Sequence, residues 1–560
     1  MDLSHLKFEA PGPGLWGTDG QHTYRPVTAM KMATYPSMSS GMRIGSSRYG
    51  MLWDGARIVV LHRFVYLQSR MLVSRPPGPQ EVAEKRFQAL VAANPEVQER
   101  FQRAEHALTT KRWRKDVEHW DNTGRPWIMG RTLELTDVEP ANLEDEELCL
   151  HIDECLHHLG RTNEYHHILN QIGLSRSLFF FHATEWSGCT SKELEPLMVG
   201  SSPISAGDEP ELRALTEALH GDESALPLLE GDDKEKERLD ALCAREGAVG
   251  KAAKEFVRVV GYRTITGWEP MEPYILERPG DLLAKIRHGL TGDYAKMNPD
   301  DLARVRDKVP DEHRGEFDEL FEDARKFSRI KDERDIYCNM PISGLLRRGV
   351  IEAGRRAHER GKIDHVEHMT EASAGEVRQM LLEDSGPTAK QLEERYDYRA
   401  TYSIRDIPET LGEPDQFPIE PEWLPDASRT LALLSGGRRP ARDQEQEQEQ
   451  EQDTVELTGS VASPGVYEGI ARVLEASKDL GKIEKGDVLI TTATNPAFNV
   501  VLPQVGAIVT EYGGILSHAA IIAREFGLPA VVGCKDVMNK INDGDRVRVD
   551  GETGEVTVLS

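Results

Sequence analysis

The last part of the chain, from Thr454 to Ser560, alternates short apolar, β-branched runs with Gly and Asp turns. Runs of this length and composition are typical of buried strands. They are GVYEGIARVLE, GDVLITT, GAIVTEY, PAVVG, DRVRVDG and EVTVL. Between Ser517 and Phe526 the apolar positions instead follow the helical period, and Gly527 and Pro529 end the run. The pattern predicts a small α/β domain with one clear helix.

The chain before residue 434 has a different pattern. Its Gly/Pro-rich start leads to an expected β-hairpin from Arg48 to Tyr66, with Asp54–Gly55 as the turn. Beyond Gln80, apolar residues recur mostly at i, i+3 and i+4, which predicts helices. The clearest are EVAEKRFQALVAANPEVQERFQRAEHAL, ELCLHIDECLHHLGRTNEYHHILNQI, AAKEFVRVVGY and PISGLLRRGVIEAGRRAHERGK. Residues 1–434 are therefore expected to form a large, mainly helical domain.

A polar segment, SGGRRPARDQEQEQEQEQD at 435–453, separates the two parts. It has closely spaced like charges and no apolar stripe, so burial cannot offset its ordering entropy. Fully extended, it would reach roughly 60 Å at about 3.3 Å per residue. We interpret it as a flexible tether or a neutral linker. The predicted fold class is α+β: a helical domain at 1–434, the tether, and a small α/β domain at 454–560.

Composition narrows the partners and the compartment. A length of 560 residues indicates several domains, and a net charge of −27 argues against a nucleic acid as the main partner. The six cysteines show no CxxC spacing, which favours reduced thiols over a disulfide framework or a zinc site. The first residues have no signal-peptide pattern, and no apolar run approaches membrane-spanning length. We expect a cytoplasmic protein that does not bind membranes.

The motif GGILSHAAIIAREFGLPAVVG, residues 513–533, is the strongest functional signal. Gly513 and Gly514 permit a tight turn and the close approach of a phosphate. Ser517 is placed as a helix N-cap, so His518 falls in the first turn, where free N–H groups and the helix dipole favour an anion. Neutral imidazole is a nucleophile near pH 7. The motif predicts a phosphorylated histidine rather than a metal ligand, since no second ligand lies at helical spacing.

Together with DGDRVRVDGETGEV further on, this motif resembles the swivelling phosphohistidine domain of phosphoenolpyruvate-utilising enzymes, such as phosphoenolpyruvate synthase and rifampicin phosphotransferase. Looser similarities to the central domain of rifampicin phosphotransferase-like enzymes lie at 255–286 and 329–370. The resemblance implies that the domain at 454–560 swivels on the tether and that His518 carries a phosphoryl group.

The family's ATP-grasp domain and its phosphoenolpyruvate-handling barrel are not recognisable in this sequence, although a diverged nucleotide site within 1–250 stays open. The layout is similar to the histidine-bearing subunit of two-component phenylphosphate or 4-methylphenyl (cresol) phosphate synthase. That resemblance implies a partner ATP-grasp subunit, which uses ATP and Mg²⁺ and releases AMP and phosphate. This chain alone would bind neither ATP nor Mg²⁺. The acceptor would be a small aromatic hydroxyl compound such as phenol or 4-cresol.

Candidates for the acceptor side are less specific. Phosphoryl transfer needs positive charge around the transferred group and a base for the hydroxyl. The arginines of the family-like stretches are candidates for the charge: Arg263, Arg334, Arg347 and Arg355. His22, in a Gly/Pro-rich loop, could be the base, and His182, near Trp186, could line an aromatic pocket. For each of these residues a structural role is also open.

Other interpretations stay open. The histidines at 151, 157, 158, 166 and 167 are tempting as metal ligands, but core or surface roles are favoured, so we expect no metal site. The same relay could phosphorylate an antibiotic or a biosynthetic intermediate. A non-catalytic protein that reports phosphorylation state is a third hypothesis.

Overall fold

The computed structural model describes residues 3–19, 22–204, 207–231, 233–265, 269–292, 296–435, 457–474, 482–494, 498, 502–514 and 517–559. Contacts divide the chain into two compact units. The first contains Met1–Ser177, Trp268–Glu272 and Tyr337–Arg438, and the second contains Leu178–Gly267, Pro273–Ile336 and Arg439–Ser560. Much of the region before the tether is thus grouped with the carboxyl-terminal residues, and the boundaries at 434 and 454 stay a prediction. Apart from the backbone of Ser435, the expected tether lies outside the described residues.

The first unit contains a small antiparallel sheet in the order β2-β3-β1-β4. Its strands are β1 (Trp16–Thr18), β2 (Trp53–Leu61), β3 (Phe64–Met71) and β4 (Thr410–Leu411). The hairpin formed by β2 and β3 is present, but its predicted turn is wrong. His62 and Arg63, both with positive φ, make the turn, whereas Gly55, at φ +90°, lies at an irregularity within β2. Gly tolerates that conformation, so the Asp-Gly pair marks a bulge rather than the turn.

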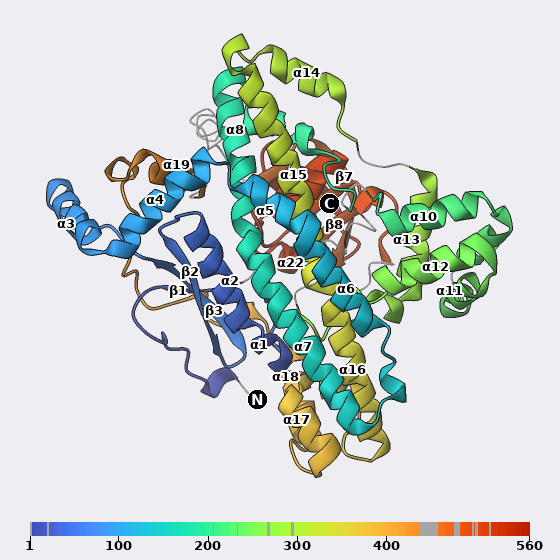
Figure 1. The fold of residues 1–560 in the computed structure, drawn as a ribbon. Coiled ribbons are helices and arrows are strands. Elements are labelled where there is room, and N and C mark those ends of the chain that lie inside the picture. Colours follow the sequence, from blue (N-terminus) through green and yellow to red (C-terminus); the bar gives the residue numbers. More distant parts are fainter. Residues whose placement is uncertain are drawn as a thin grey trace. The chain divides into compact units, whose positions relative to one another are not determined.

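Helix α2 of the first unit lies between this sheet and α7 (Figure 1). Helix α2 contacts both β2 and α7, and α16 contacts α7. The predicted helical run after Gln80 is divided at Asn94, which caps the second helix ahead of Pro95. The helices are α1 (Ala29–Met32), α2 (Tyr35–Arg48), α3 (Gln80–Ala93), α4 (Pro95–Thr109), α5 (Trp113–His119), α6 (Arg125–Thr136), α7 (Asp145–Ile168), α16 (Met340–Glu359), α17 (Ala374–Arg378), α18 (Ala389–Thr401) and α19 (Asp426–Ser435).

The helical part of the second unit includes a cluster of α10, α11, α12 and α13, and Leu242 and Phe256 are among its buried residues. A short 3₁₀ helix, η5 (Glu195–Met198), lies elsewhere in this part. The helices are α8 (Leu174–Ser187), α9 (Ser191–Leu194), α10 (Pro210–His220), α11 (Glu235–Ala244), α12 (Gly247–Val260), α13 (Pro279–Thr291), α14 (Pro299–Asp307) and α15 (Arg314–Cys338); the first four residues of α8 and the last two of α15 belong to the first unit.

The carboxyl-terminal part of the second unit is built on a sheet in the order β5-β12-β11-β7-β8-β9-β10-β6. Strands β7 to β10 are parallel, and the pairs at both ends are antiparallel. The predicted strand runs and the helix are confirmed. The elements are β5 (Leu457–Thr458), β6 (Ser460–Ser463), β7 (Val466–Leu474), β8 (Val488–Thr491), β9 (Ala507–Thr510), α21 (His518–Phe526), β10 (Ala530–Val532), α22 (Val537–Lys540), β11 (Arg546–Asp550) and β12 (Glu555–Leu559).

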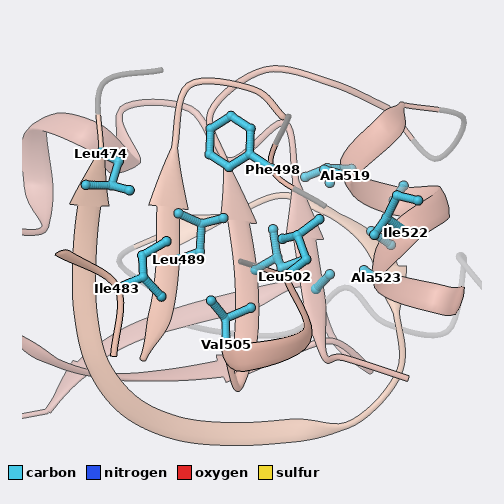
Figure 2. Packing of buried hydrophobic residues seen from close by; sticks show 14 residues of the cluster. Leu474, Ile483, Leu489, Phe498, Leu502, Val505, Ala519, Ile522 and Ala523 are labelled. Atoms are coloured by element: carbon cyan, nitrogen blue, oxygen red, sulfur yellow. The ribbon is translucent and has the colours of Figure 1, made fainter. Parts of the chain in front are cut away.

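Buried side chains lie on both faces of this sheet, which explains its nearly continuous apolar strands. One cluster joins Leu489 of β8 to Ala519, Ile522 and Ala523 of α21 (Figure 2). This packing fixes the start of α21 beside the ends of β8 and β9. Among the described residues, none of the helices combines the length and apolar character needed to cross a membrane.

Candidate functional site

The loop from β9 into α21 has the geometry that the sequence predicts. Helix α21 begins at His518, and the Ser517 hydroxyl accepts the backbone N–H of Ala520 at 3.4 Å as the N-cap. Gly513 has φ +125°, a conformation that favours glycine, and a Cβ at Gly514 would meet no atom within 4 Å. The backbone beside His518 therefore leaves open space on this side. Gly527, at φ +65°, ends the helix.

The two ring nitrogens of His518 have different surroundings. Nδ1 lies 2.9 Å from the hydroxyl oxygen of Thr494. Nε2 is buried and has no hydrogen-bond partner among the described residues, although the residue as a whole is partly exposed. A buried N–H without a partner is rarer than an unsatisfied acceptor. The favoured tautomer therefore has Nδ1–H donating to Thr494 and an electron pair on Nε2.

The imidazole is held in its neutral form. Burial lowers the pKa of His518 to about 3, and the positive charge of Lys331 on α15 adds to this effect. Neutral imidazole with a free electron pair is the nucleophilic form of histidine. The local geometry thus provides a nucleophile at the amino end of a helix, where an anion would be stabilised.

Helix α21 also contacts the helical part of its own unit. Arg524 lies 3.6 Å from the carboxylate of Glu195 in η5, and both side chains are largely buried. Arg524 donates a second bond to the Ala462 carbonyl oxygen at 2.8 Å. In this structure α21 therefore lies against η5, Lys331 is close enough to act on His518, and Nε2 is covered.

The other candidate residues of the second unit are His182, Arg263 and Arg334, and the first two have defined side-chain partners. His182 stacks on Trp186 at 4.9 Å between ring centroids and lies 3.7 Å from Glu185; burial lowers its pKa. Arg263 is buried and pairs with Glu209 at 2.9 Å. Arg334 lies on α15 and is partly exposed. The contacts of these three residues with other described residues do not include His518, and their roles stay predictions.

The remaining candidates lie in the first unit. His22 Nδ1 is 2.8 Å from the Asp19 carboxylate, which can orient the ring. On α16, Arg347 is buried and pairs with Glu367 at 2.7 Å. Arg355 is about half exposed and pairs with Glu352 at 2.8 Å. Both arginines are thus balanced by carboxylates, as the structural interpretation expects, and their part in transfer stays a prediction.

The histidines considered as metal ligands have other neighbours. His151 lies 3.7 Å from Cys155, and His158 lies 3.2 Å from the hydroxyl of Thr132. His167 bonds the Asn163 carbonyl oxygen at 2.8 Å. Within the described ranges, no group of three or more His, Cys, Asp or Glu side chains is arranged to hold a metal ion.

Sequence reasoning missed Thr494, Lys331 and Glu195. A signal existed for Thr494, because it follows β8 and the His518 loop follows β9. Carboxyl ends of neighbouring parallel strands meet at one sheet edge, where ligands commonly bind. Lys331 and Glu195 come from segments far away in the sequence, and no local pattern links them to the motif.

Comparison with known proteins bears directly on this site. Residues 483–554 match the family model described as the PEP-utilising enzyme, mobile domain. Over these residues the carboxyl-terminal region is therefore similar to the mobile domain of the PEP-utilising enzymes. His518 and its loop lie within the matched residues, so the resemblance predicted from the motif is confirmed at the level of the family.

Relatives extend the similarity beyond this domain. An "Uncharacterized phosphotransferase YvkC" from Bacillus subtilis is 28% identical over 55% of this chain and 36% of its own length. A "Probable phosphoenolpyruvate synthase" from Archaeoglobus fulgidus is 35% identical over 33% of this chain and 26% of its length. A "Rifampicin phosphotransferase" from Streptomyces sviceus is 46% identical over 19% of this chain and 12% of its length. The chain thus spans little more than a third of the length of these relatives at most, and two of the three are named as phosphotransferases.

Proposed function

We propose that this chain is the phosphohistidine-bearing component of a phosphotransferase, which accepts a phosphoryl group on His518 and passes it to an organic hydroxyl group. One observation carries this proposal: Nε2 of a neutral histidine, with its Nδ1 bonded to Thr494, stands at the amino end of α21 without a partner among the described residues. The names of the relatives support the same reaction class.

The chemistry balances in two steps. In the first, the electron pair of Nε2 attacks phosphorus, an N–P bond forms, and the P–O bond to the leaving group breaks with its electrons. In the second, the acceptor oxygen attacks the same phosphorus and loses its proton to a base, while the N–P electrons return to Nε2. Nδ1–H stays bonded to Thr494 throughout, so the imidazole can leave as a neutral ring.

The helix start suits the charged intermediate. A phosphoryl group on Nε2 carries oxygen acceptors and negative charge, which the first turn of α21 would stabilise. Because Nε2 is buried here, loading also requires the site to open. Breaking the Arg524–Glu195 pair would be one part of that opening.

The proposal also includes the source of the phosphoryl group and the molecule that accepts it. The sequence resemblance to two-component aryl phosphate synthases supports ATP as the source, through a separate ATP-grasp subunit that binds Mg²⁺. It also supports a phenol such as phenol or 4-cresol as the acceptor, with AMP and phosphate as the other products. For these products ATP acts as a diphosphoryl donor: AMP is the leaving group of the first step, and water then removes the terminal phosphate, so that one phosphoryl group stays on Nε2 for the second step. An antibiotic or a biosynthetic intermediate would use the same histidine chemistry.

A loading experiment tests the proposal. The full chain is mixed with ATP and Mg²⁺, with and without a candidate ATP-grasp subunit, and the His518 peptide is examined by mass spectrometry for an acid-labile phosphoryl group. We expect the label on His518 only with the partner. His518→Gln should abolish it, while the matched exposed variant His220→Gln should keep it.

Two other outcomes would change the proposal in different ways. Label from ATP alone would replace the two-subunit proposal with a nucleotide site in this chain. An absence of label, with a partner shown to be active, would overturn the phosphotransferase proposal in favour of a non-catalytic role.

A further inference from the structure

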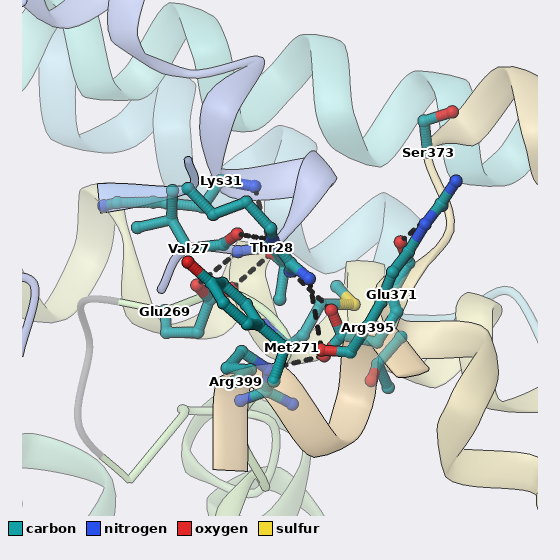
Figure 3. A network of polar contacts seen from close by, with 12 residues as sticks. Val27, Thr28, Lys31, Glu269, Met271, Glu371, Ser373, Arg395 and Arg399 are labelled. Carbon is teal, nitrogen blue, oxygen red and sulfur yellow. Dashed lines mark hydrogen bonds and ion pairs between the residues drawn. The ribbon is translucent and has the colours of Figure 1, made fainter. Parts of the chain in front are cut away.

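A cluster of charged and polar side chains in the first unit is separate from the His518 loop. It joins the loop after β1, helices α1 and α2, and the segment around residue 269. Glu269 is fixed there: its carboxylate accepts the Thr28 hydroxyl at 2.6 Å, the Thr28 N–H at 3.2 Å and the Met271 N–H at 3.2 Å (Figure 3). Asp19 is buried and bonded to His22. Both carboxylates are therefore held in place by their own protein contacts.

Tyr35 lacks the partner that a buried hydroxyl normally has. The residue is 6% exposed, and its hydroxyl oxygen is buried without a hydrogen bond to any described residue. Burial, together with the nearby charges of Glu269 and Asp19, raises its pKa, so the phenol keeps its proton. Buried hydroxyl groups are usually bonded, because an unpaired one costs free energy. A buried hydroxyl group that has no acceptor and lies near charged groups marks a place for a bound molecule.

Lys31 is a second donor beside Tyr35. Its Nζ lies 5.7 Å from the centroid of the Tyr35 ring. The Lys31 backbone N–H bonds the Thr28 hydroxyl at 3.2 Å, whereas no ion pair or hydrogen bond joins Nζ to another described residue. Burial lowers its pKa, while the carboxylates of Glu269, Asp19 and Glu272 act in the opposite direction. Lys31 and Tyr35 thus bring two donors towards fixed carboxylates.

The charges of the cluster indicate what kind of molecule can bind there. Three carboxylates surround one lysine, so a phosphate or a carboxylate would be repelled. Arg63 and Arg399 both bind the fully buried carboxylate of Glu371, and the charge of Arg399 also acts on Glu269 and Glu272. With these groups included, four carboxylates face three cations, so one net negative charge remains. A hydroxyl group fits the cluster, because its oxygen can accept from the two donors and its hydrogen can bond a carboxylate.

We propose that Tyr35, Lys31, Asp19 and Glu269 form the binding site for the acceptor: an organic molecule that carries a hydroxyl group and no negative charge. The hydroxyl oxygen accepts from Tyr35 and Lys31. The description of this occupant as the phosphoryl acceptor rests on the function proposed for His518, whereas the binding itself does not.

A binding assay without ATP or a partner subunit tests the site. The full chain is titrated with phenol and with cyclohexanol by saturation-transfer NMR. We expect at least one of them to bind the wild type, and Tyr35→Phe and Lys31→Met to raise its Kd at least tenfold. Benzoate, an anion of similar size, should bind at least tenfold more weakly than the neutral compound.

Tyr49→Phe is the matched control. Tyr49 is also buried, but its hydroxyl donates to Asp116 at 2.8 Å. This variant should lower the Tm and leave the Kd unchanged, whereas Tyr35→Phe should raise the Kd without lowering the Tm of the free protein. The pair separates loss of binding from loss of folding.

The proposal is overturned if neither neutral compound binds the wild type, if Tyr35→Phe and Lys31→Met bind within twofold of it, or if benzoate binds equally well. His518→Gln should bind the neutral compound like the wild type. A failure of His518 loading would therefore leave this site standing, and a failure here would leave the loading result standing.

Discussion

Thr494→Val removes the hydroxyl group that is bonded to His518 Nδ1 and nearly keeps the shape of the side chain. The hydroxyl lies 2.9 Å from Nδ1 and is largely buried, so valine leaves Nδ1–H without an acceptor. The tautomer with the electron pair on Nε2 then loses its advantage. Leaving a buried donor unpaired costs about 1–3 kcal/mol, which corresponds to roughly 5- to 150-fold in a rate.

The assay is the initial rate of phosphoryl incorporation into His518 under loading conditions. We expect Thr494→Val to reduce this rate roughly tenfold or more. Thr494→Ser, which keeps the hydroxyl, should recover most of it. The ¹⁵N chemical shifts of His518 should show Nδ1 protonated in the wild type and in the serine variant, and a mixture of tautomers in the valine variant.

Two results would refute this reasoning. The first is a valine variant that loads as fast as the wild type with an unchanged tautomer. The second is a serine variant that is as slow as valine, which would show that the methyl group rather than the hydroxyl matters. A Tm close to that of the wild type in both variants excludes unfolding as the cause.

Three further predictions follow from charge and burial. NMR titration should give His518 a pKa of about 3, far below the usual 6.5, and a midpoint near 6.5 would contradict this. Because the unfolded chain takes up this proton first, the folded protein should have its full stability above about pH 6.5 and should lose stability as the pH falls from there towards 3. Arg263→Met should destabilise the chain by about 3 kcal/mol in urea unfolding, because it removes a buried partner of Glu209, and adding Glu209→Gln should restore part of the loss if the pair is the cause. Glu195→Gln weakens the pair with Arg524, worth about 1 kcal/mol, so amide exchange across α21 should accelerate roughly fivefold; unchanged exchange would show that the pair does not hold α21.

The fold was predictable where the signal is local. The run from Ser517 to Gly527 has an N-cap, a helical period and a glycine stop, and the structure places α21 there. The buried parallel strands were recognisable from their continuous apolar residues. The hairpin turn was not, because Asp54–Gly55 has the local appearance of a turn while pairing of β2 with β3 places the turn at His62–Arg63.

The site was predictable only in its motif. His518 and Ser517 were found because adjacent residues carry the signal. The bond between Thr28 and Glu269 spans 241 positions, and only folding brings this pair beside Tyr35. The same holds for Arg263, whose neutralising partner lies 54 positions away. Charge compensation and unsatisfied buried donors are tertiary properties, so single-residue reasoning could not separate functional from structural charges.

A single-turnover chase tests the central claim most directly. The chain is loaded, separated from ATP and from the partner subunit, and mixed with phenol or another hydroxyl acceptor that binds it; ³¹P NMR then follows the phosphohistidine signal. The account predicts that the N–P signal of His518 disappears while an equal amount of phosphate ester appears. A phosphohistidine that persists with the bound acceptor, or an ester formed by the His518→Gln chain, would contradict it.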